Sequence, residues 1–198
     1  MYIENLFPEP VGLFDSFRPL NDSELFYVKK ELQSTRSNTS NRTSNNSYVL
    51  KSQELEELNT FCLNSVSEFT TAIYGTQIDL RIEQSWLNIT KENEYHHVHS
   101  HPNSIISGVF YIETSELDNI CFYGSAAYDY QPVPGNNRWN SQSWWLPTPQ
   151  GSLVLFKSNL KHGVPLLKKQ GNRISLSFNT FFNGAFGDSL NLSYVSMP

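Results

Sequence analysis

The chain has 198 residues, of which 38% are hydrophobic and 14% aromatic, and its formal net charge at pH 7 is -5. This length and apolar content suit one compact domain with a substantial core, so we expect residues 1–198 to form a single domain. The negative charge, with no cluster of Lys and Arg longer than a pair, argues against nucleic acid as a partner. No stretch approaches the roughly 20 apolar residues of a membrane helix, so no membrane partner is expected either.

The cysteines and the N-terminus bear on the compartment. Cys62 and Cys121 have neither the CxxC spacing of a redox motif nor the density of a disulfide scaffold. Such thiols are typical of a reducing compartment. The first residues also lack the basic segment, apolar run and cleavage site of a secretion signal. We therefore expect a cytoplasmic protein.

The first third of the chain predicts one short strand, one helix and one loop. Residues 2–7 alternate weakly before two prolines, which predicts an opening strand. Asn21 can cap a helix that runs to about Gln33. Residues 34–48 are almost wholly Ser, Thr and Asn. Because this segment has almost nothing apolar to bury, we expect a flexible loop.

A second, longer helix is predicted over residues 52–74. Its apolar positions recur every three or four residues, and Gly75 supplies a helix stop. These positions are Leu55, Leu58, Cys62, Val66, Phe69 and Ile73. From Ile78 to Trp86 the hydrophobic period changes to two, which predicts a strand.

Short strands separated by turns are predicted for the remainder of the chain. They lie at residues 96–101, 105–112, 119–123, 152–156 and 173–182. Two helices followed by about eight strands indicate a mainly β fold with helices packed on a jelly roll. One long loop, residues 124–143, interrupts the predicted strands, and loops of this length inside a compact domain are often functional.

The histidines are unevenly distributed. Four of the five form one run, His96, His97, His99 and His101, and the fifth is His162. Because residues i and i+2 of a strand face the same side, His97, His99 and His101 are expected to share a face. Imidazole is a common ligand of transition metals. The run alone leaves two interpretations open, a metal site and a polar strand that faces solvent.

Five short motifs follow one another over most of the chain, from about residue 6 to residue 182. They are Leu6-Phe7-Pro8, Trp86-x-Asn88, His99-x-His101-Pro102, Ser107-Gly108-Val109-x-Tyr111 and Arg173-x-Ser175-x-x-Phe178-Asn179. With His162 eleven residues before Arg173, their order resembles the Fe(II)/2-oxoglutarate-dependent oxygenase superfamily. The closer resemblance is to its prolyl-hydroxylase-like branch.

The resemblance implies a double-stranded β-helix (jelly roll) supported by the two N-terminal helices. It implies that His99, His101 and His162 hold Fe(II). Three protein ligands on one face of the ion leave positions for a keto acid and for dioxygen.

The resemblance also implies a set of residues that bind 2-oxoglutarate. Arg173 offers a planar fork that can bind the distal carboxylate with two hydrogen bonds. Ser175 lies on the same strand face and can add a hydroxyl donor. Tyr111 and Asn88 are candidates for further contacts, although a core tyrosine is commonly a packing residue and Asn88 is also suited to closing a turn.

Residue 101 departs from the superfamily, which usually has a carboxylate at this position. A neutral imidazole removes one negative charge from the iron site. Glu113, Asp118 and Asp129 remain possible substitutes, although none has the expected spacing.

Taken as a whole, the resemblance implies a dioxygenase, a hydroxylase that couples oxidative decarboxylation of 2-oxoglutarate to oxidation of an unidentified small molecule or peptide. One alternative is a cupin-like metal protein, because Pro149-x-Gly151 and the later histidine resemble positions in cupin sequence motifs. The glutamate that cupins place after their HxH is absent. A second alternative is a non-catalytic jelly-roll binding module, since fold alone does not determine function.

An aromatic segment, residues 123–145, adds a candidate substrate surface. It contains Tyr128, Tyr130, Trp139, Trp144 and Trp145. In the resembled fold this connection lies near the mouth of the site, so these side chains either receive substrate or cover an end of the barrel.

Overall fold

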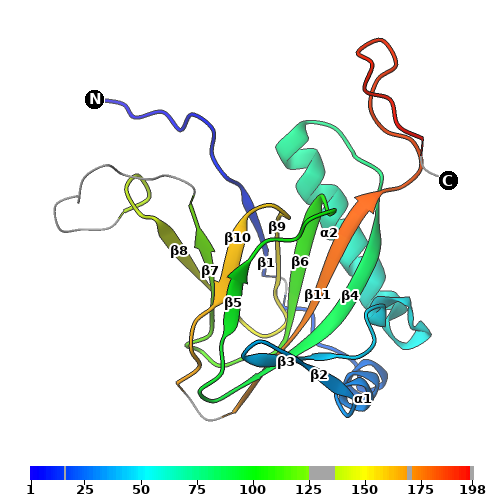
Figure 1. The fold of residues 1–198 in the computed structure, drawn as a ribbon, viewed down its shortest axis with the longest axis vertical. Coiled ribbons are helices and arrows are strands. Elements are labelled where there is room, and N and C mark those ends of the chain that lie inside the picture. Colours follow the sequence, from blue (N-terminus) through cyan, green and yellow to red (C-terminus); the bar gives the residue numbers. More distant parts are fainter. Residues whose placement is uncertain (16, 125–136, 169–170, 197–198) are drawn as a thin grey trace.

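The computed structural model describes residues 1–15, 17–124, 137–168 and 171–196. Within these residues two antiparallel β-sheets are formed, and the helices cover the outer face of the larger one (Figure 1). The expected mainly β fold with two N-terminal helices, a double-stranded β-helix, is confirmed. None of the described helices is long and apolar enough to cross a membrane.

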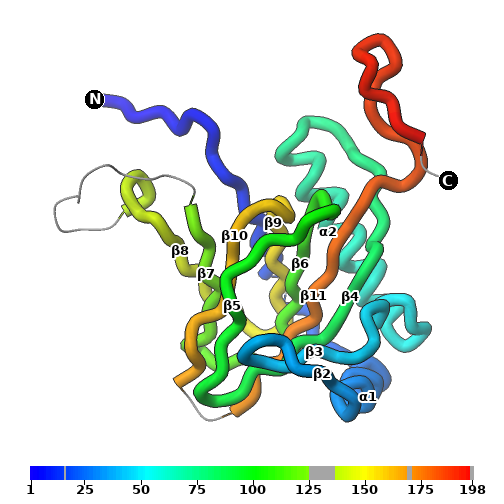
Figure 2. Tube along the Cα trace, viewed as in Figure 1, coloured from blue at the N-terminus to red at the C-terminus, as the bar shows by residue number. Residues whose placement is uncertain are grey.

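The larger sheet has seven strands and the smaller has four. In spatial order the larger contains β1 (Val11–Phe14), β9 (Leu153–Lys157), β6 (Ile106–Glu113), β11 (Asn172–Phe182), β4 (Leu80–Lys91), β3 (Asn41–Ser44) and β2 (Thr35–Asn38). The smaller contains β5 (His96–His99), β10 (Lys161–Val164), β7 (Asn119–Tyr123) and β8 (Ser143–Pro147). Segments distant in sequence thus become neighbours, as β1 with β9 and β5 with β10 (Figure 2).

The two predicted helices are present. Helix α1 (Asp22–Glu31) begins after Asn21, whose side chain accepts a hydrogen bond from the Glu24 backbone. Helix α2 (Glu56–Tyr74) follows two 3₁₀ turns, Val49–Lys51 and Gln53–Leu55. It ends at Gly75, which has the left-handed φ of 72° that glycine adopts readily.

Alternation along the central strands separates the core into two layers. Leu176 and Phe178 of β11 pack with the helices in the outer hydrophobic cluster. Val109 and Tyr111 of β6 belong to the inner cluster, between the sheets. Arg173 alternates with the outward residues of β11 and lies on the same strand face as Ser175 and Ser177, which line the cavity. Strand alternation therefore directs a cation into the interior.

A β-bulge in β4 changes which residues face the interior. Asn179 pairs with Gln84 while Thr180 pairs with Ile82, so Glu83 is an extra residue. Ile82 packs with the outer cluster before the bulge, and Leu87 does so after it. Trp86 therefore faces the inner cavity, opposite to Ile82, although the two residues are four positions apart in the predicted strand.

The loop expected at residues 34–48 is instead largely a β-hairpin, formed by β2 and β3. Strand β3 joins the larger sheet, where Thr43 pairs with Asn88 of β4. The buried Ser44 hydroxyl accepts a hydrogen bond of 3.0 Å from the Leu87 backbone N–H. The segment is ordered because sheet pairing and side-chain hydrogen bonds compensate for the missing apolar residues.

The opening strand is also displaced from its expected position. Residues 2–7 form no strand, and the first strand is β1, after the prolines. Val11 to Phe14 pair with β9 at the edge of the larger sheet. Pairing with β9 determines which N-terminal segment forms a strand, and the local sequence does not encode this pairing.

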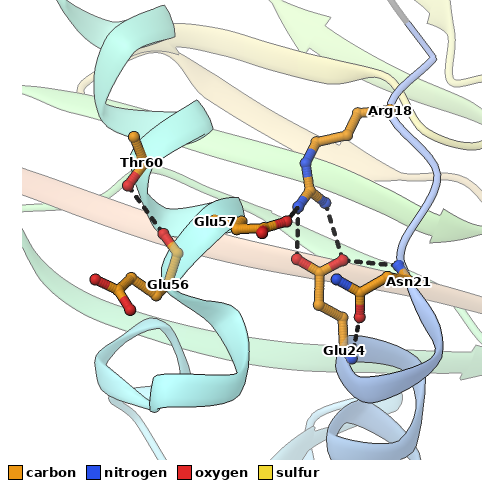
Figure 3. A network of polar contacts seen from close by, with 6 residues as sticks. All are labelled: Arg18, Asn21, Glu24, Glu56, Glu57 and Thr60. Atoms are coloured by element: carbon orange, nitrogen blue, oxygen red, sulfur yellow. Dashed lines mark hydrogen bonds and ion pairs between the residues drawn. The ribbon is translucent and has the colours of Figure 1, made fainter.

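A partly buried ion pair lies between the two helices (Figure 3). The Arg18 guanidinium donates to both carboxylate oxygens of Glu24, at 3.1 and 2.5 Å, and its Nη2 lies 3.7 Å from Glu57 at the start of α2. Glu24 is fully buried and also accepts from the Asn21 backbone N–H at 2.8 Å. Arg18 therefore neutralises a buried charge while it connects the beginnings of α1 and α2.

Replacing this arginine tests its contribution to stability. Arg18→Met should lower the free energy of unfolding by about 2 to 4 kcal/mol, because it leaves Glu24 as an uncompensated buried charge. Urea unfolding measures the change, with Lys29→Met on the exposed face of α1 as the control. Equal stability of the two variants would show that the ion pair contributes little.

Candidate functional site

Three histidines predicted as ligands meet at one end of the smaller sheet. His99 ends β5, His101 follows two residues later, and His162 lies in β10 directly opposite His99. Their candidate ligand atoms all lie within 4.8 Å of one another, and His162 is buried. The structure thus brings these three side chains together, and their role as metal ligands remains a prediction.

The hydrogen bonds of these rings suit metal binding. Nδ1 of His99 donates to the carbonyl of His97 at 2.8 Å, and Nδ1 of His162 donates to that of Leu160 at 2.9 Å. Each ring is thereby oriented and presents Nε2 as the free ligand atom. Nε2 of His101 lies 3.2 Å from Nε2 of His162. Two nitrogens at right angles on one ion, with bonds of roughly 2.1 Å, would be about 3.0 Å apart.

Burial keeps these rings in the neutral form. Desolvation, with a smaller contribution from neighbouring His99, lowers the pKa of His101 to about 4 and that of His162 to about 3. The pKa of His99 is lowered for the same first reason. Neutral imidazole is the form that binds a metal, so a cation would not have to displace protons at neutral pH.

The run of histidines does not follow simple alternation. His162 pairs with His99 and Val164 with His96, so β5 contains one residue more than β10 over this stretch. His97 still lies beside His99, as alternation predicts, and both line one groove with His101. His96, which alternation places on the other face, also lines that groove and the inner cavity, and it stacks on His99 with ring centroids 4.7 Å apart. The sequence pattern missed His96 because nothing in it signals the bulge.

His96, His97 and His99 form a second group with metal-binding potential. It shares His99 with the first group, and one Nε2 atom serves one ion. His96 already accepts a hydrogen bond at Nε2 from Asn38. The first group, whose Nε2 atoms converge, is thus the better candidate.

No carboxylate belongs to either group among the residues that the structure describes. Glu113 is exposed at the end of β6, and Asp118 accepts hydrogen bonds from Ser115 in a turn. Asp129 lies outside the described residues. The described part of the candidate site therefore offers three histidines and no carboxylate, and their role as a metal site stays a prediction.

Arg173 lies in the same cavity as the histidines and is 2% exposed. Its Nε and Nη2 atoms are buried without a hydrogen-bond partner. No carboxylate of the described residues forms an ion pair with it. An unpaired buried cation is costly, so this arrangement favours an anionic ligand that enters the cavity.

The other predicted contacts of the cosubstrate have different positions. Ser175 and Asn88 line the cavity. The Asn88 amide donates to Ser177 at 2.9 Å, which leaves its buried Oδ1 unpaired. Tyr111 does not line the cavity but lies beneath Arg173, whose guanidinium carbon is 5.1 Å from the ring centroid. Tyr111 therefore supports the arginine by a cation–π contact.

Burial raises the pKa of Tyr111 to about 12, an effect opposed by the positive charge of Arg173. The phenol is thus neutral at physiological pH. Its buried hydroxyl has no hydrogen-bond partner among the described residues.

Other residues of the motifs pack against one another. Gly108 lies where a Cβ atom would overlap the Phe178 ring, so the motif glycine permits close packing of β6 and β11. The Ser107 hydroxyl donates to Asn179 at 2.8 Å. Of these four residues, Ser107 and Gly108 line the cavity, and Phe178 lies in the outer hydrophobic cluster.

The described tryptophans of the aromatic segment, Trp139, Trp144 and Trp145, line neither the cavity nor the groove beside the histidines. Trp144 and Trp145 are about half exposed on β8, and Tyr128 and Tyr130 lie outside the described residues. The aromatic residue at the site is Trp86, whose ring stacks on His101 with centroids 5.7 Å apart. Trp86 lines both the cavity and the neighbouring groove.

Comparisons with known proteins relate part of the chain to one protein family. Residues 84–179 match the family described as "Putative 2OG-Fe(II) oxygenase", a range that contains all three histidines and Arg173. No curated protein sequence matches the chain significantly.

Solved structures share the fold. An oxidoreductase of the 2OG-Fe(II) oxygenase family from Burkholderia pseudomallei is 11% identical, with a TM-score of 0.59 over 86% of this chain and 83% of that one. A Pseudomonas putida prolyl-4-hydroxylase is 10% identical, with a TM-score of 0.59 over 89% and 94%. SnoN, an alpha-ketoglutarate-dependent epimerase from nogalamycin biosynthesis, is 11% identical, with a TM-score of 0.61 over 91% and 82%.

Two single substitutions distinguish the histidine groups. His162→Ala should abolish Fe(II) binding at micromolar metal, because it removes one of three converging ligands. His97→Ala should bind like the parent, since His97 belongs only to the second group. Anaerobic titration with Fe(II), or with Mn(II) as a redox-stable substitute, measures both. The opposite pattern would assign the metal to the second group.

Proposed function

The chain belongs to the 2OG-Fe(II) oxygenase family, and from this premise we propose that it couples oxidative decarboxylation of 2-oxoglutarate to hydroxylation of a substrate. The family implies Fe(II), 2-oxoglutarate and dioxygen as the reaction partners. The observation that carries the proposal is Arg173, a buried and unpaired cation in one cavity with three converging histidines.

His99, His101 and His162 would hold the iron. When bound, iron with 2-oxoglutarate supplies the redox chemistry that activates dioxygen. The residues themselves supply three neutral donors, two of them oriented by backbone carbonyls. Phe156 packs against His162, with ring centroids 4.4 Å apart, and restricts water on that side.

Arg173 would bind the distal carboxylate of 2-oxoglutarate. Its two unpaired nitrogens provide donors for a charge-assisted interaction. Ser175, two residues along the same strand face, adds a hydroxyl to the cavity wall. Asn88 would offer its N–H₂ group to the cosubstrate only if its side-chain amide were rotated by half a turn. The Ser177 hydroxyl would then donate to Oδ1 of Asn88.

A separate groove gives the substrate access to the histidines. It has a volume of about 330 Å³ and is bounded by hairpin β2–β3, by Gln84 and Trp86 of β4, and by the histidine run. Its described lining includes Arg36 and no carboxylate. We propose that it receives a small polar molecule or one side chain of a peptide.

Hydroxylation is favoured over the other outcomes that this fold supports. SnoN is an epimerase, and inversion of a carbon requires a hydrogen donor on the face opposite the one attacked. Tyrosine and cysteine are suited to that role, and neither lines the cavity or the groove among the described residues. The cupin-like alternative gives no role to the buried cation.

Substitution of the arginine separates cosubstrate binding from metal binding. Arg173→Leu should retain Fe(II) affinity and weaken 2-oxoglutarate by tens-fold to thousands-fold, roughly 2 to 5 kcal/mol, because a charge-assisted pair in a desolvated site is lost. Arg173→Lys should fall between, since it keeps the charge but not the fork.

Isothermal titration of 2-oxoglutarate into anaerobic Fe(II)-loaded protein measures these affinities. Arg42→Leu, an exposed arginine of β3, is the control and should match the parent. If Arg173→Leu binds as tightly as the parent, or the parent binds no 2-oxoglutarate, the cupin-like interpretation becomes the better one.

A further inference from the structure

His96 occupies a position in the cavity that the metal site does not explain. The extra residue in β5 places its ring beside His99, in a stacked pair inclined by 24°. It lines the inner cavity together with Arg173 and also the outer groove. Arg173 belongs to the larger sheet and His96 to the smaller, so the two side chains contribute to opposite walls of one cavity.

The hairpin β2–β3 fixes this ring from outside. The Asn38 amide has two N–H groups, and it donates to Oδ1 of Asn41 at 3.0 Å and to Nε2 of His96 at 3.2 Å. Asn41 is 3% exposed and donates in turn to the buried Thr90 hydroxyl at 3.4 Å. The orientation of the Asn38 amide is therefore set by a chain of hydrogen bonds that ends on β4.

This bond determines which ring nitrogen of His96 carries hydrogen. Because Nε2 accepts from Asn38, the neutral ring has its hydrogen on Nδ1. Nε2 is also unavailable to a metal. Among the described residues none accepts a hydrogen bond from Nδ1. His96, which lines the cavity, thus has one N–H donor for which the described residues provide no acceptor.

We propose that His96 is a further residue that binds 2-oxoglutarate, by donating Nδ1–H to one of its oxygens, and that Asn38 is the positioning residue that selects this tautomer. The inference rests on the proposed function. A carboxylate offers about four acceptor positions, so the fork of Arg173 leaves room for another donor. The hairpin that the sequence presents as a polar loop then has a role in cosubstrate recognition.

Titration of 2-oxoglutarate into anaerobic Mn(II)-loaded protein tests His96. His96→Phe keeps the aromatic volume and removes the donor, and it should weaken 2-oxoglutarate about tenfold to hundredfold while metal affinity is unchanged. His96→Gln keeps an N–H donor and should recover part of the loss. His97→Phe, the neighbour that does not line the inner cavity, is the matched control.

Asn38 is tested by its effect on the tautomer. In protein labelled with ¹⁵N-histidine and loaded with Zn(II), the parent should show His96 protonated at Nδ1. Asn38→Leu should give a mixture of tautomers and weaken 2-oxoglutarate several-fold. Asn45→Leu, an exposed asparagine after the same hairpin, should change neither quantity.

The outcomes separate this inference from the proposed function. Binding of 2-oxoglutarate by the parent and equally by His96→Phe would overturn the role of His96 and leave the proposed function standing. Loss of metal from both His96 variants would make His96 a ligand instead, which also overturns the inference. A parent that binds metal but no 2-oxoglutarate would overturn both. A parent His96 protonated at Nε2 would remove the role of Asn38.

Discussion

A positive charge held inside the barrel without a protein counter-charge is the constraint on which the site depends. Strand alternation directs Arg173 inward, Tyr111 lies beneath its guanidinium, and no described carboxylate pairs with it. Burying a guanidinium without an anion is unfavourable, so this arrangement lowers the stability of the fold unless an anion binds. The carboxylate of a bound ligand would reduce that cost, and this is the physical basis of the proposed binding site.

Metal ligation by three histidines, as proposed, would change the electrostatics of this cavity. A carboxylate at position 101 would offset part of the charge of a divalent ion, whereas His101 does not. Iron and Arg173 would then face the two negative charges of 2-oxoglutarate without a competing anionic ligand. At short range in a desolvated cavity this should strengthen the attraction for the dianion. Such a site would bind 2-oxoglutarate more strongly. It would bind the metal ion more weakly, because it lacks the negative charge of a carboxylate ligand.

The sequence predicted much of the fold because local signals were strong. Asn21 begins α1, Gly75 ends α2, and the apolar strands appear close to their expected ranges. The three histidines and Arg173 also meet in one cavity. The order and spacing of the motifs predicted this, whereas no single local pattern could. The assignment of their roles is still a prediction.

The differences have a common physical origin in strand pairing and register. Residues 34–48 looked like a loop because they lack apolar side chains, yet pairing with β4 orders part of them. One extra residue at Glu83 reverses the faces of β4, and one in β5 brings His96 into the cavity. Bulges leave no signature in hydrophobic periodicity, so a face assigned by counting residues fails beyond them.

The most direct test of the account is the visible spectrum of the protein with Fe(II) and 2-oxoglutarate under anaerobic conditions. If the three histidines hold iron in the cavity that Arg173 prepares for the keto acid, a weak charge-transfer band should appear only when both are present. The band should be absent with either one alone. Absence of the band at concentrations where Fe(II) and 2-oxoglutarate both bind would show that they do not meet, and would contradict the central claim.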